Sequence, residues 1–192
     1  RADPRAAEAR YLLATLYVEQ GDHAAAIKEL TRPGPTNAAL LARVVQRYEG
    51  LVAAAPEDIP LRAALLQALL LAKQHDRILE IGRDTLKRRD DQSTASISMV
   101  MGDALLEKGD SDGAVRRYFA ACKRDPRLSI EAIARLRRLI ELEGKHPFGC
   151  LALAKLLAQE GRATEAVECL KAAHAGDPAL HESVVLELEG LM

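Results

Sequence analysis

The chain has 192 residues, enough for one domain with a core or for an array of small units that bury surface against their neighbours. Alanine and leucine dominate, aromatic residues make up 3% and tryptophan is absent, so neither a β-sheet nor a core of bulky side chains is expected. The 27 basic and 28 acidic residues leave a formal net charge of −1, which excludes a global field that would attract nucleic acid or anionic lipid.

Membrane and targeting signals are missing from the sequence. No apolar stretch approaches the roughly 20 residues that a helix needs to cross a bilayer, so we expect no membrane insertion of this segment. The chain begins Arg-Ala-Asp-Pro, without an initiator Met or a signal-peptide pattern, and we interpret it as an excerpt from a longer protein. Its cysteines, Cys122, Cys150 and Cys169, form no C-x-x-C motif, which favours a reducing compartment and a cytoplasmic location.

The first segment, residues 5–32, is predicted to form two helices joined at Gly21. Glycine accepts the positive φ that ends a helix, and alanine lets two helices approach closely. Pro33-Gly34-Pro35 should stop the second helix early, because proline cannot continue the helical hydrogen bonds. The apolar and small positions of this segment are Leu13, Ala14, Tyr17, Ala26 and Leu30.

A single helix over residues 37–55 follows. Its apolar side chains recur with a helical period, and Pro56 comes directly after it. The next segment, residues 61–90, is a degenerate pair of helices. It has His75 where a glycine is expected and Glu80 where a small residue is expected.

The segment 95–126 shows the pattern most fully. It contains Gly109 and Pro126, residue types that end helices, and Gly102 and Ala114, residue types small enough for two helices to approach closely.

The remaining segments repeat these features. A second single helix is predicted over residues 128–143, before Pro147, and the segment 147–178 repeats the offsets of the pair at 95–126. The last helix, over residues 179–191, should cover the end of the array with an apolar stripe inward and glutamates outward.

These recurring offsets resemble the tetratricopeptide-repeat (TPR) family. The stretch 101–110, followed by Ala114, Tyr118, Ala121 and Pro126, matches nearly every signature position of that family. The resemblance implies an all-α fold: an α-solenoid of antiparallel helix pairs with extra single helices and a C-terminal capping helix, in one domain of residues 1–192. The Ala-, Leu- and Arg-rich composition suggests a bacterial source.

The spacing of the turns indicates an internal duplication. Gly109 lies 34 positions after His75, which is the TPR period, whereas the steps from Gly21 to His75 and from Gly109 to Gly161 are 54 and 52 positions. Each longer step leaves room for one extra helix. The order is then pair, single helix, pair, twice over, with the halves meeting near residue 91.

No sequence motif of catalysis, nucleotide binding or metal binding is present, so we predict no enzymatic activity, no cofactor and no small-molecule substrate. A metal site on His174, His181 and Glu182 is less favoured than solvated loop histidines. For Cys150 and Cys169, packing between paired helices is favoured over a redox role.

Two basic clusters occur, residues 87–89 and the arginines at positions 135, 137 and 138. Aromatic residues that could stack on bases are not interleaved with them. A solvated face, or docking to an acidic protein, is therefore favoured over nucleic-acid binding.

In TPR proteins the first helix of each pair lines a concave groove. None of the matching positions here is asparagine, so we exclude the carboxylate clamp by which some TPR proteins hold a chaperone's C-terminus. The mostly apolar positions suit an amphipathic helix or an extended hydrophobic peptide. An equally weighted alternative is that Leu65, Leu69 and Met99 are core residues. The matching positions are Tyr11, Thr15, Leu65, Leu69, Met99, Asp103, Leu151 and Lys155.

The function predicted from the sequence is a scaffold or adaptor that binds a partner peptide or helix in this groove. One alternative is a nucleic-acid-binding helical repeat, whose affinity would fall steeply with salt. Another is a regulatory module of an enzyme that lies outside this segment.

Overall fold

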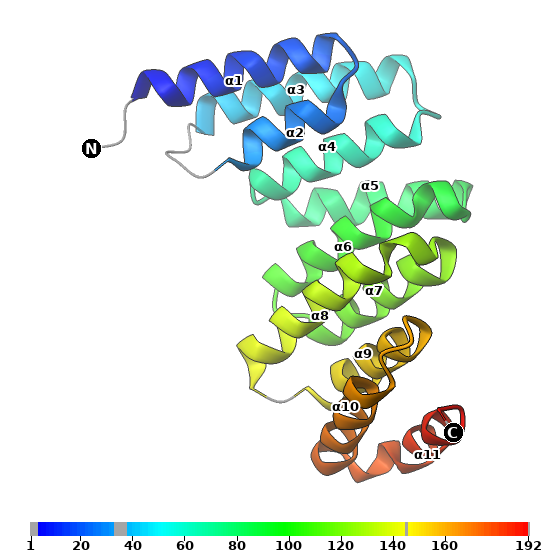
Figure 1. The fold of residues 1–192 in the computed structure, drawn as a ribbon. Helices are drawn as coiled ribbons and strands as arrows, with labels where there is room; N and C mark the ends of the chain where they lie inside the picture. The colour runs from blue at the N-terminus through cyan, green and yellow to red at the C-terminus, as the bar shows by residue number, and fades with distance from the viewer. Residues whose placement is uncertain (1–3, 33–37, 145, 192) are drawn as a thin grey trace. The chain divides into compact units, whose positions relative to one another are not determined.

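The computed structural model describes residues 4–32, 38–144 and 146–191, and within these ranges the chain is helical and contains no strand (Figure 1). The predicted all-α fold class is therefore confirmed. The helices are α1 (Pro4–Glu19), α2 (His23–Thr31), α3 (Ala38–Ala54), α4 (Ile59–Leu71), α5 (His75–Arg88), α6 (Ala95–Glu107), α7 (Ser111–Arg124), α8 (Ser129–Glu143), α9 (Pro147–Gln159), α10 (Ala163–Gly176) and α11 (His181–Glu189). Short 3-10 helices precede α6, α8 and α11: η1 (Gln92–Thr94), η2 (Pro126–Leu128) and η3 (Pro178–Leu180).

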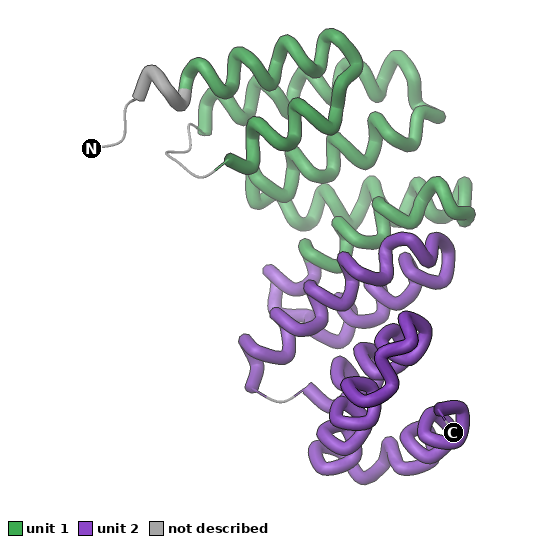
Figure 2. Tube along the Cα trace, in the orientation of Figure 1, with its two compact units in different colours: residues 1–104 green, residues 105–192 purple. Residues whose placement is uncertain are grey.

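The chain divides into two compact units, Arg1–Ala104 and Leu105–Met192 (Figure 2). The division falls within α6, so unit 1 contains α1 to α5 and most of α6, and unit 2 contains α7 to α11. The duplication inferred from the sequence places its own boundary near residue 91, ahead of α6. One domain over residues 1–192 stays a prediction.

Unit 1 is built on α4, which contacts α2, α3 and α5, while α1 packs on α2 and α3. Its core is made of apolar side chains from these helices, among them Leu66, Leu69 and Ile78, which are fully buried. Burying one such side chain contributes roughly 1.5–3 kcal/mol, which exceeds the helix-propensity penalty of an ordinary residue.

Unit 2 repeats part of this arrangement around α9. This helix contacts α7, α8 and α10, and α10 also packs on α11. In both units an extra single helix, α3 or α8, packs on the first helix of the following pair. Leu136, Leu156 and Leu170 are fully buried between these helices.

All four helix pairs share one turn, the Schellman motif. Its central residue has a positive φ: 76° at Gly21, 58° at Lys73, 82° at Gly109 and 75° at Gly161. In each turn the next N–H donates to the carbonyl oxygen five residues earlier. These N···O distances are 2.9 Å (Asp22 to Tyr17), 3.0 Å (Gln74 to Leu69), 2.9 Å (Asp110 to Leu105) and 2.8 Å (Arg162 to Leu157).

The prediction that His75 takes the glycine position was therefore wrong, because Lys73 has the left-handed conformation. His75 is the first residue of α5, and Glu80 is exposed on that helix. Gly109 lies 36 positions after Lys73, so the expected 34-residue step does not hold here. Lysine rarely adopts a positive φ, and the sequence pattern therefore carried no signal for this turn.

The same shift changes which positions of α5 carry small residues. The fifth and ninth residues after the turn are Ala114 and Tyr118 in α7, but Ile78 and Gly82 in α5. The order of small and large side chains is thus reversed in α5. Met101 fills the space beside Gly82, where an added Cβ would lie 2.4 Å from its sulfur.

Side-chain capping marks where α2, α4 and α7 begin. Asp22, Asp58 and Asp110 each accept a hydrogen bond from the N–H three residues further on, at 2.9, 2.9 and 2.8 Å. Helix α2 ends at Thr31 after 9 residues, whereas α5, α7 and α10 have 14. The early end that we predicted is confirmed, while Pro33-Gly34-Pro35 lie outside the described residues.

Candidate functional site

The predicted groove residues are divided between the two units, with only Leu151 and Lys155 in unit 2. Two groove residues were predicted on each of the helices α1, α4, α6 and α9. On α1, α6 and α9 the first of the two is buried and the second is half-buried. The buried members are Tyr11, Met99 and Leu151, and the half-buried members are Thr15, Asp103 and Lys155.

The two predicted residues on α4 depart from this pattern, because both are buried: Leu65 is 2% exposed and Leu69 is 0% exposed. Counting from Lys73 in place of His75 moves the matching positions to Ala63, which is buried, and Gln67, which is half-buried. The alternative named Leu65, Leu69 and Met99 as core residues, and the burial of all three, with Met99 also 2% exposed, agrees with it. As binding residues they stay a prediction.

A pocket of about 220 Å³ lies between α7 and α9 in unit 2. Each helix contributes four residues at positions i, i+3, i+4 and i+7, which form one face of a helix. Two of the predicted groove residues, Leu151 and Lys155, are among them. The lining residues are Arg116, Phe119, Ala120 and Lys123 of α7 and Phe148, Leu151, Ala152 and Lys155 of α9.

The pocket combines an apolar wall with a basic rim. Phe119 and Phe148 are half-buried, and they are the two phenylalanines of the whole chain. The guanidinium carbon of Arg116 lies 6.0 Å from the centre of the Phe148 ring, within the range of a cation–π interaction. Lys155 Nζ lies 3.0 Å from Glu187 Oε1 of α11. Such a pocket can hold a large apolar side chain next to an anionic group.

Six residues of this pocket were not predicted from the sequence: Arg116, Phe119, Ala120 and Lys123 of α7, and Phe148 and Ala152 of α9. The groove prediction considered two positions on the first helix of each pair, so it left out the second helix α7 and the other lining residues of α9. A usable signal was present, because the spacing of Arg, Phe, Ala and Lys on α7 matches that of Phe, Leu, Ala and Lys on α9.

Cys122 and Cys150 are buried, Cys169 is half-buried, and two of the histidines lie side by side. Burial raises the pKa of Cys122 to about 11, and it also raises the pKa of Cys150 and Cys169, which disfavours the reactive thiolate. The rings of His174 and His181 lie 5.2 Å apart. Among the described residues, no three His, Cys, Asp or Glu side chains are placed to hold a metal ion.

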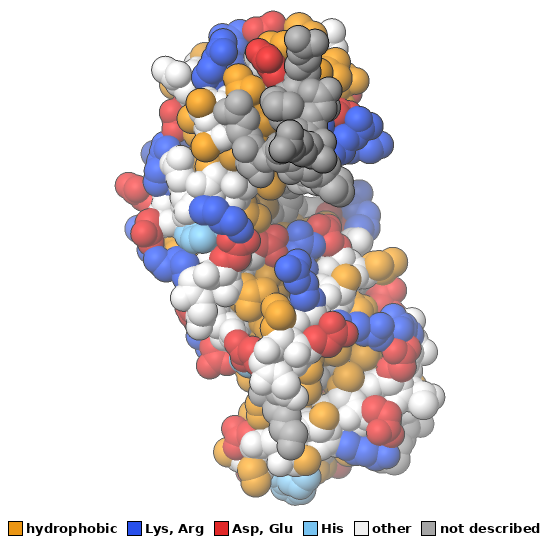
Figure 3. Space-filling model, turned by 90° about the vertical axis from the view of Figure 1, so that its left-hand side faces the viewer, with side chains coloured by type: hydrophobic (Ala, Val, Ile, Leu, Met, Phe, Trp, Pro, Cys, Tyr) orange, Lys and Arg blue, Asp and Glu red, His pale blue; other side chains and the backbone are white. Residues whose placement is uncertain are grey.

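The basic clusters are largely paired with carboxylates. Arg88 and Arg89 form ion pairs with Asp84 and Asp91 at 3.1 and 2.6 Å. Arg135 and Arg137 pair with Glu131 and Glu165 at 2.6 and 2.5 Å. Charges of both signs are interspersed on the face drawn in Figure 3. Four of the six cations in these clusters are therefore engaged with carboxylates, which reduces the positive charge available to phosphates.

The length and apolar character of the helices decide whether any of them could span a membrane. Within the described ranges, none combines the length and apolar character that a span requires.

Comparison with known proteins identifies the first helix pair. The family model described as "Tetratricopeptide repeat" matches residues 7–32, which cover most of α1 and all of α2. No protein with a curated description matches the chain. The resemblance to the TPR family is therefore confirmed at this pair, and the chain is a helical-repeat protein that carries a tetratricopeptide repeat.

Two solved structures of MamA are similar to this chain. A MamA mutant has a TM-score of 0.39 and 15% sequence identity, with 90% of this chain and 96% of that chain covered. A second MamA structure, marked AMB-1, has a TM-score of 0.37 and 15% identity, with 90% and 99% covered. With TM-scores this low, neither likeness identifies the function of this chain.

Proposed function

We propose that this chain is a protein-interaction scaffold that binds a polypeptide partner on the faces of its helix pairs and catalyses no reaction of its own. A scaffold role in general agrees with the tetratricopeptide repeat at residues 7–32. The observation that carries the proposal is the pocket between α7 and α9, because exposed apolar surface next to polar side chains is typical of protein-binding sites.

The proposed binding surface includes two residues that the sequence analysis had selected, Leu151 and Lys155. It is extended by Phe119 and Phe148, whose half-buried rings are large rigid contacts of the kind that dominate binding energy at interfaces. Tyr11, Thr15, Met99 and Asp103 remain proposed contacts at the corresponding positions of unit 1. We place the protein in the cytoplasm, a location supported by its three free cysteines.

Photo-crosslinking in cells tests this proposal. Gln159 is exposed and lies one turn beyond Lys155 on the same face of α9. With Gln159→para-benzoylphenylalanine, illumination should link the chain to one or a few polypeptides. The matched control is Ala134→para-benzoylphenylalanine, at an exposed site on α8. The same adducts from both positions, or none from Gln159, would contradict a partner at this surface.

A further inference from the structure

We propose that the pocket between α7 and α9 binds an acidic polypeptide segment, which inserts one bulky apolar side chain beside Phe119, Phe148 and Leu151. Carboxylates of that segment then meet Arg116 and Lys123 on the rim. This inference rests on the proposed scaffold function and names the chemistry of its partner.

The size of the pocket fits a single side chain. Its volume is about 220 Å³, and a cavity of roughly 150 Å³ with apolar walls is enough to bind benzene. Leu151 and Ala152 are buried beneath it, and the two phenylalanine rings are half-buried at its wall. A leucine or phenylalanine side chain would therefore be removed from water against carbon on several sides, which is favourable.

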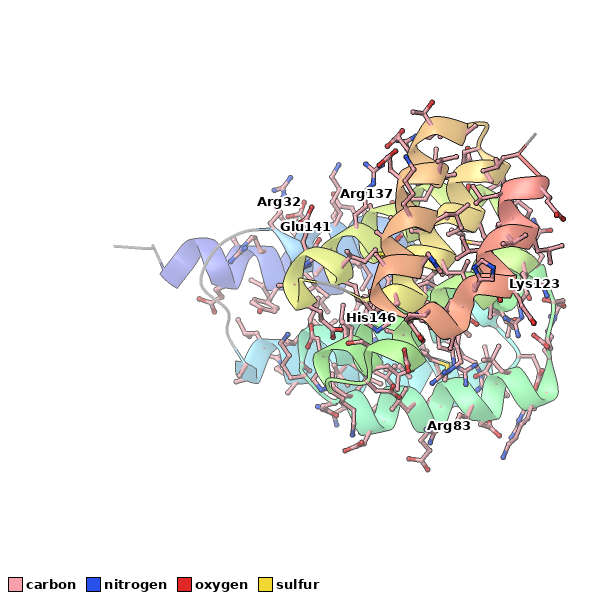
Figure 4. The ribbon with its side chains drawn as sticks, turned by 90° about the horizontal axis from the view of Figure 1, so that it is seen from below. Arg32, Arg83, Lys123, Arg137, Glu141 and His146 are labelled. Atoms are coloured by element: carbon pink, nitrogen blue, oxygen red, sulfur yellow. The ribbon has the colours of Figure 1, made fainter. Side chains whose placement is uncertain are left out.

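The charges around the pocket fit an acidic partner. Three cations and no carboxylate line it, and Glu187 already pairs with Lys155. Among the described residues, no carboxylate pairs with Arg116 or Lys123, and both side chains are exposed. Arginine stacked on an aromatic ring keeps donors free for a carboxylate. In Figure 4, Lys123 lies apart from Arg137, which is paired with Glu165.

The spacing of the two free cations restricts the partner further. Arg116 and Lys123 lie seven residues apart on one helix, which is about 10.5 Å along the axis. In an extended peptide, about 10 Å separates residues three positions apart. Two acidic residues that flank two apolar residues therefore match the rim.

The other unit shows that the repeat architecture does not require this set of side chains. Helices α2 and α4 contact each other as α7 and α9 do, and Gly109 and Gly161 lie 88 positions after Gly21 and Lys73. At that offset, Thr31 and Pro60 stand in place of Phe119 and Phe148, and Gln67 stands in place of Lys155. In the sequence, Pro35 stands in place of Lys123 and Lys28 in place of Arg116. The aromatic wall and two of the three cations are thus specific to unit 2.

Fluorescence anisotropy with designed peptides tests the inference on the full chain. The probe is a fluorescein-labelled hexapeptide, Glu-Glu-Leu-Phe-Glu-Glu, with an amidated C-terminus so that only side-chain carboxylates can bind. It should bind, and added salt should weaken it. A peptide with lysine in place of every glutamate, and one with Gly-Ser in place of Leu-Phe, should bind about tenfold more weakly or not at all.

Three variants locate the binding site. Arg116→Glu combined with Lys123→Glu should weaken the acidic peptide by about tenfold or more, because attraction becomes repulsion at both rim positions. Arg138→Glu, an exposed charge reversal on α8, should leave binding unchanged. Ala120→Phe should block the pocket without a change of charge. Circular-dichroism melting curves check that each variant is folded.

The inference is overturned if the acidic peptide does not bind, if the basic peptide binds equally well, or if folded rim and pocket variants bind like the parent. If polypeptides are crosslinked at Gln159 and one of these peptide results is also found, the scaffold proposal holds and the acidic partner is excluded. Loss of both the crosslinks and peptide binding would remove the two proposals together.

Discussion

At the scale of single residues, Lys73 is a non-glycine residue in a backbone conformation that favours glycine. Its φ of 58° lies in the left-handed region, where the other three pairs have glycine. An L-residue with a side chain pays a steric penalty there that glycine avoids. Lys73→Gly should therefore raise the free energy of unfolding by roughly 0.5–1 kcal/mol.

Urea denaturation of the parent and the variant measures this difference. Gly109→Ala, which introduces the same steric penalty in the equivalent turn, should lower the free energy of unfolding by roughly 1 kcal/mol. If Lys73→Gly is as destabilising as Gly109→Ala, the two turns are not equivalent.

Tyr48 carries a buried hydroxyl that has no hydrogen-bond partner among the described residues. Burial, together with the charge of Asp22, raises the pKa of Tyr48 to about 12. The unfolded chain releases this proton near its ordinary pKa of 10, so folded stability should fall as the pH rises from about 10 to about 12. Below pH 10 both states are protonated, and the group contributes no pH dependence.

The substitution Tyr48→Phe removes the hydroxyl and keeps the ring. It should leave stability near pH 7 unchanged or raise it by up to about 1 kcal/mol, because no hydrogen bond is lost. The variant should also lose less stability than the parent between pH 10 and pH 12. Chemical denaturation at several pH values compares the two proteins, and a loss of more than about 2 kcal/mol near pH 7 would indicate a hydroxyl partner.

At the scale of elements, the contact of α5 with α6 depends on Gly82. A Cβ at this position would lie 2.4 Å from the sulfur of Met101, which is fully buried and has little room to move. Gly82→Ala should therefore cost roughly 1–3 kcal/mol of stability by overpacking, even though alanine is the better helix former.

Two comparisons separate packing from helix propensity. In the background of Met101→Ala the same Gly82→Ala change should become neutral or stabilising, which a double-mutant cycle detects. Gly50→Ala, on the exposed side of α3 with no atom within 4 Å of the added Cβ, should stabilise the protein by up to about 1 kcal/mol. Equal effects of Gly82→Ala in both backgrounds would rule out the contact with Met101.

The helices that could be predicted from the sequence are those whose ends carry glycine or proline, the residue types that end helices. Gly21, Gly109 and Gly161 mark three turns, Pro56 follows the end of α3, and Gly144, with a φ of 73°, ends α8, so the helices end close to where they were predicted to end. The turn at Lys73 has no such mark, and counting from it places the matching positions on α4 two residues earlier than the predicted Leu65 and Leu69.

The pocket could not be predicted by the same reasoning, since it joins residues of two different helix pairs. Phe119 and Phe148 come together because α7 contacts α9, and α8 packs on both of these helices. Helical periodicity reports which face of one helix is apolar, but it does not report which helix that face meets.

At the scale of the whole molecule, the two units share a pattern of helix pairs with an added single helix but differ in their exposed chemistry. The pocket with an aromatic wall and a basic rim occurs in unit 2, and its counterpart positions in unit 1 carry no phenylalanine. We therefore expect the two units to have different partners or different roles, with the acidic partner confined to unit 2.

Fluorine NMR of the full chain tests the central claim most directly. Because Phe119 and Phe148 are the two phenylalanines of the chain, labelling with para-fluorophenylalanine should give two resonances, both from the pocket. Titration with the acidic hexapeptide should shift both, and its lysine counterpart should shift neither. If neither resonance moves with the acidic peptide, or both move equally with the basic one, this pocket is not the site of an acidic partner.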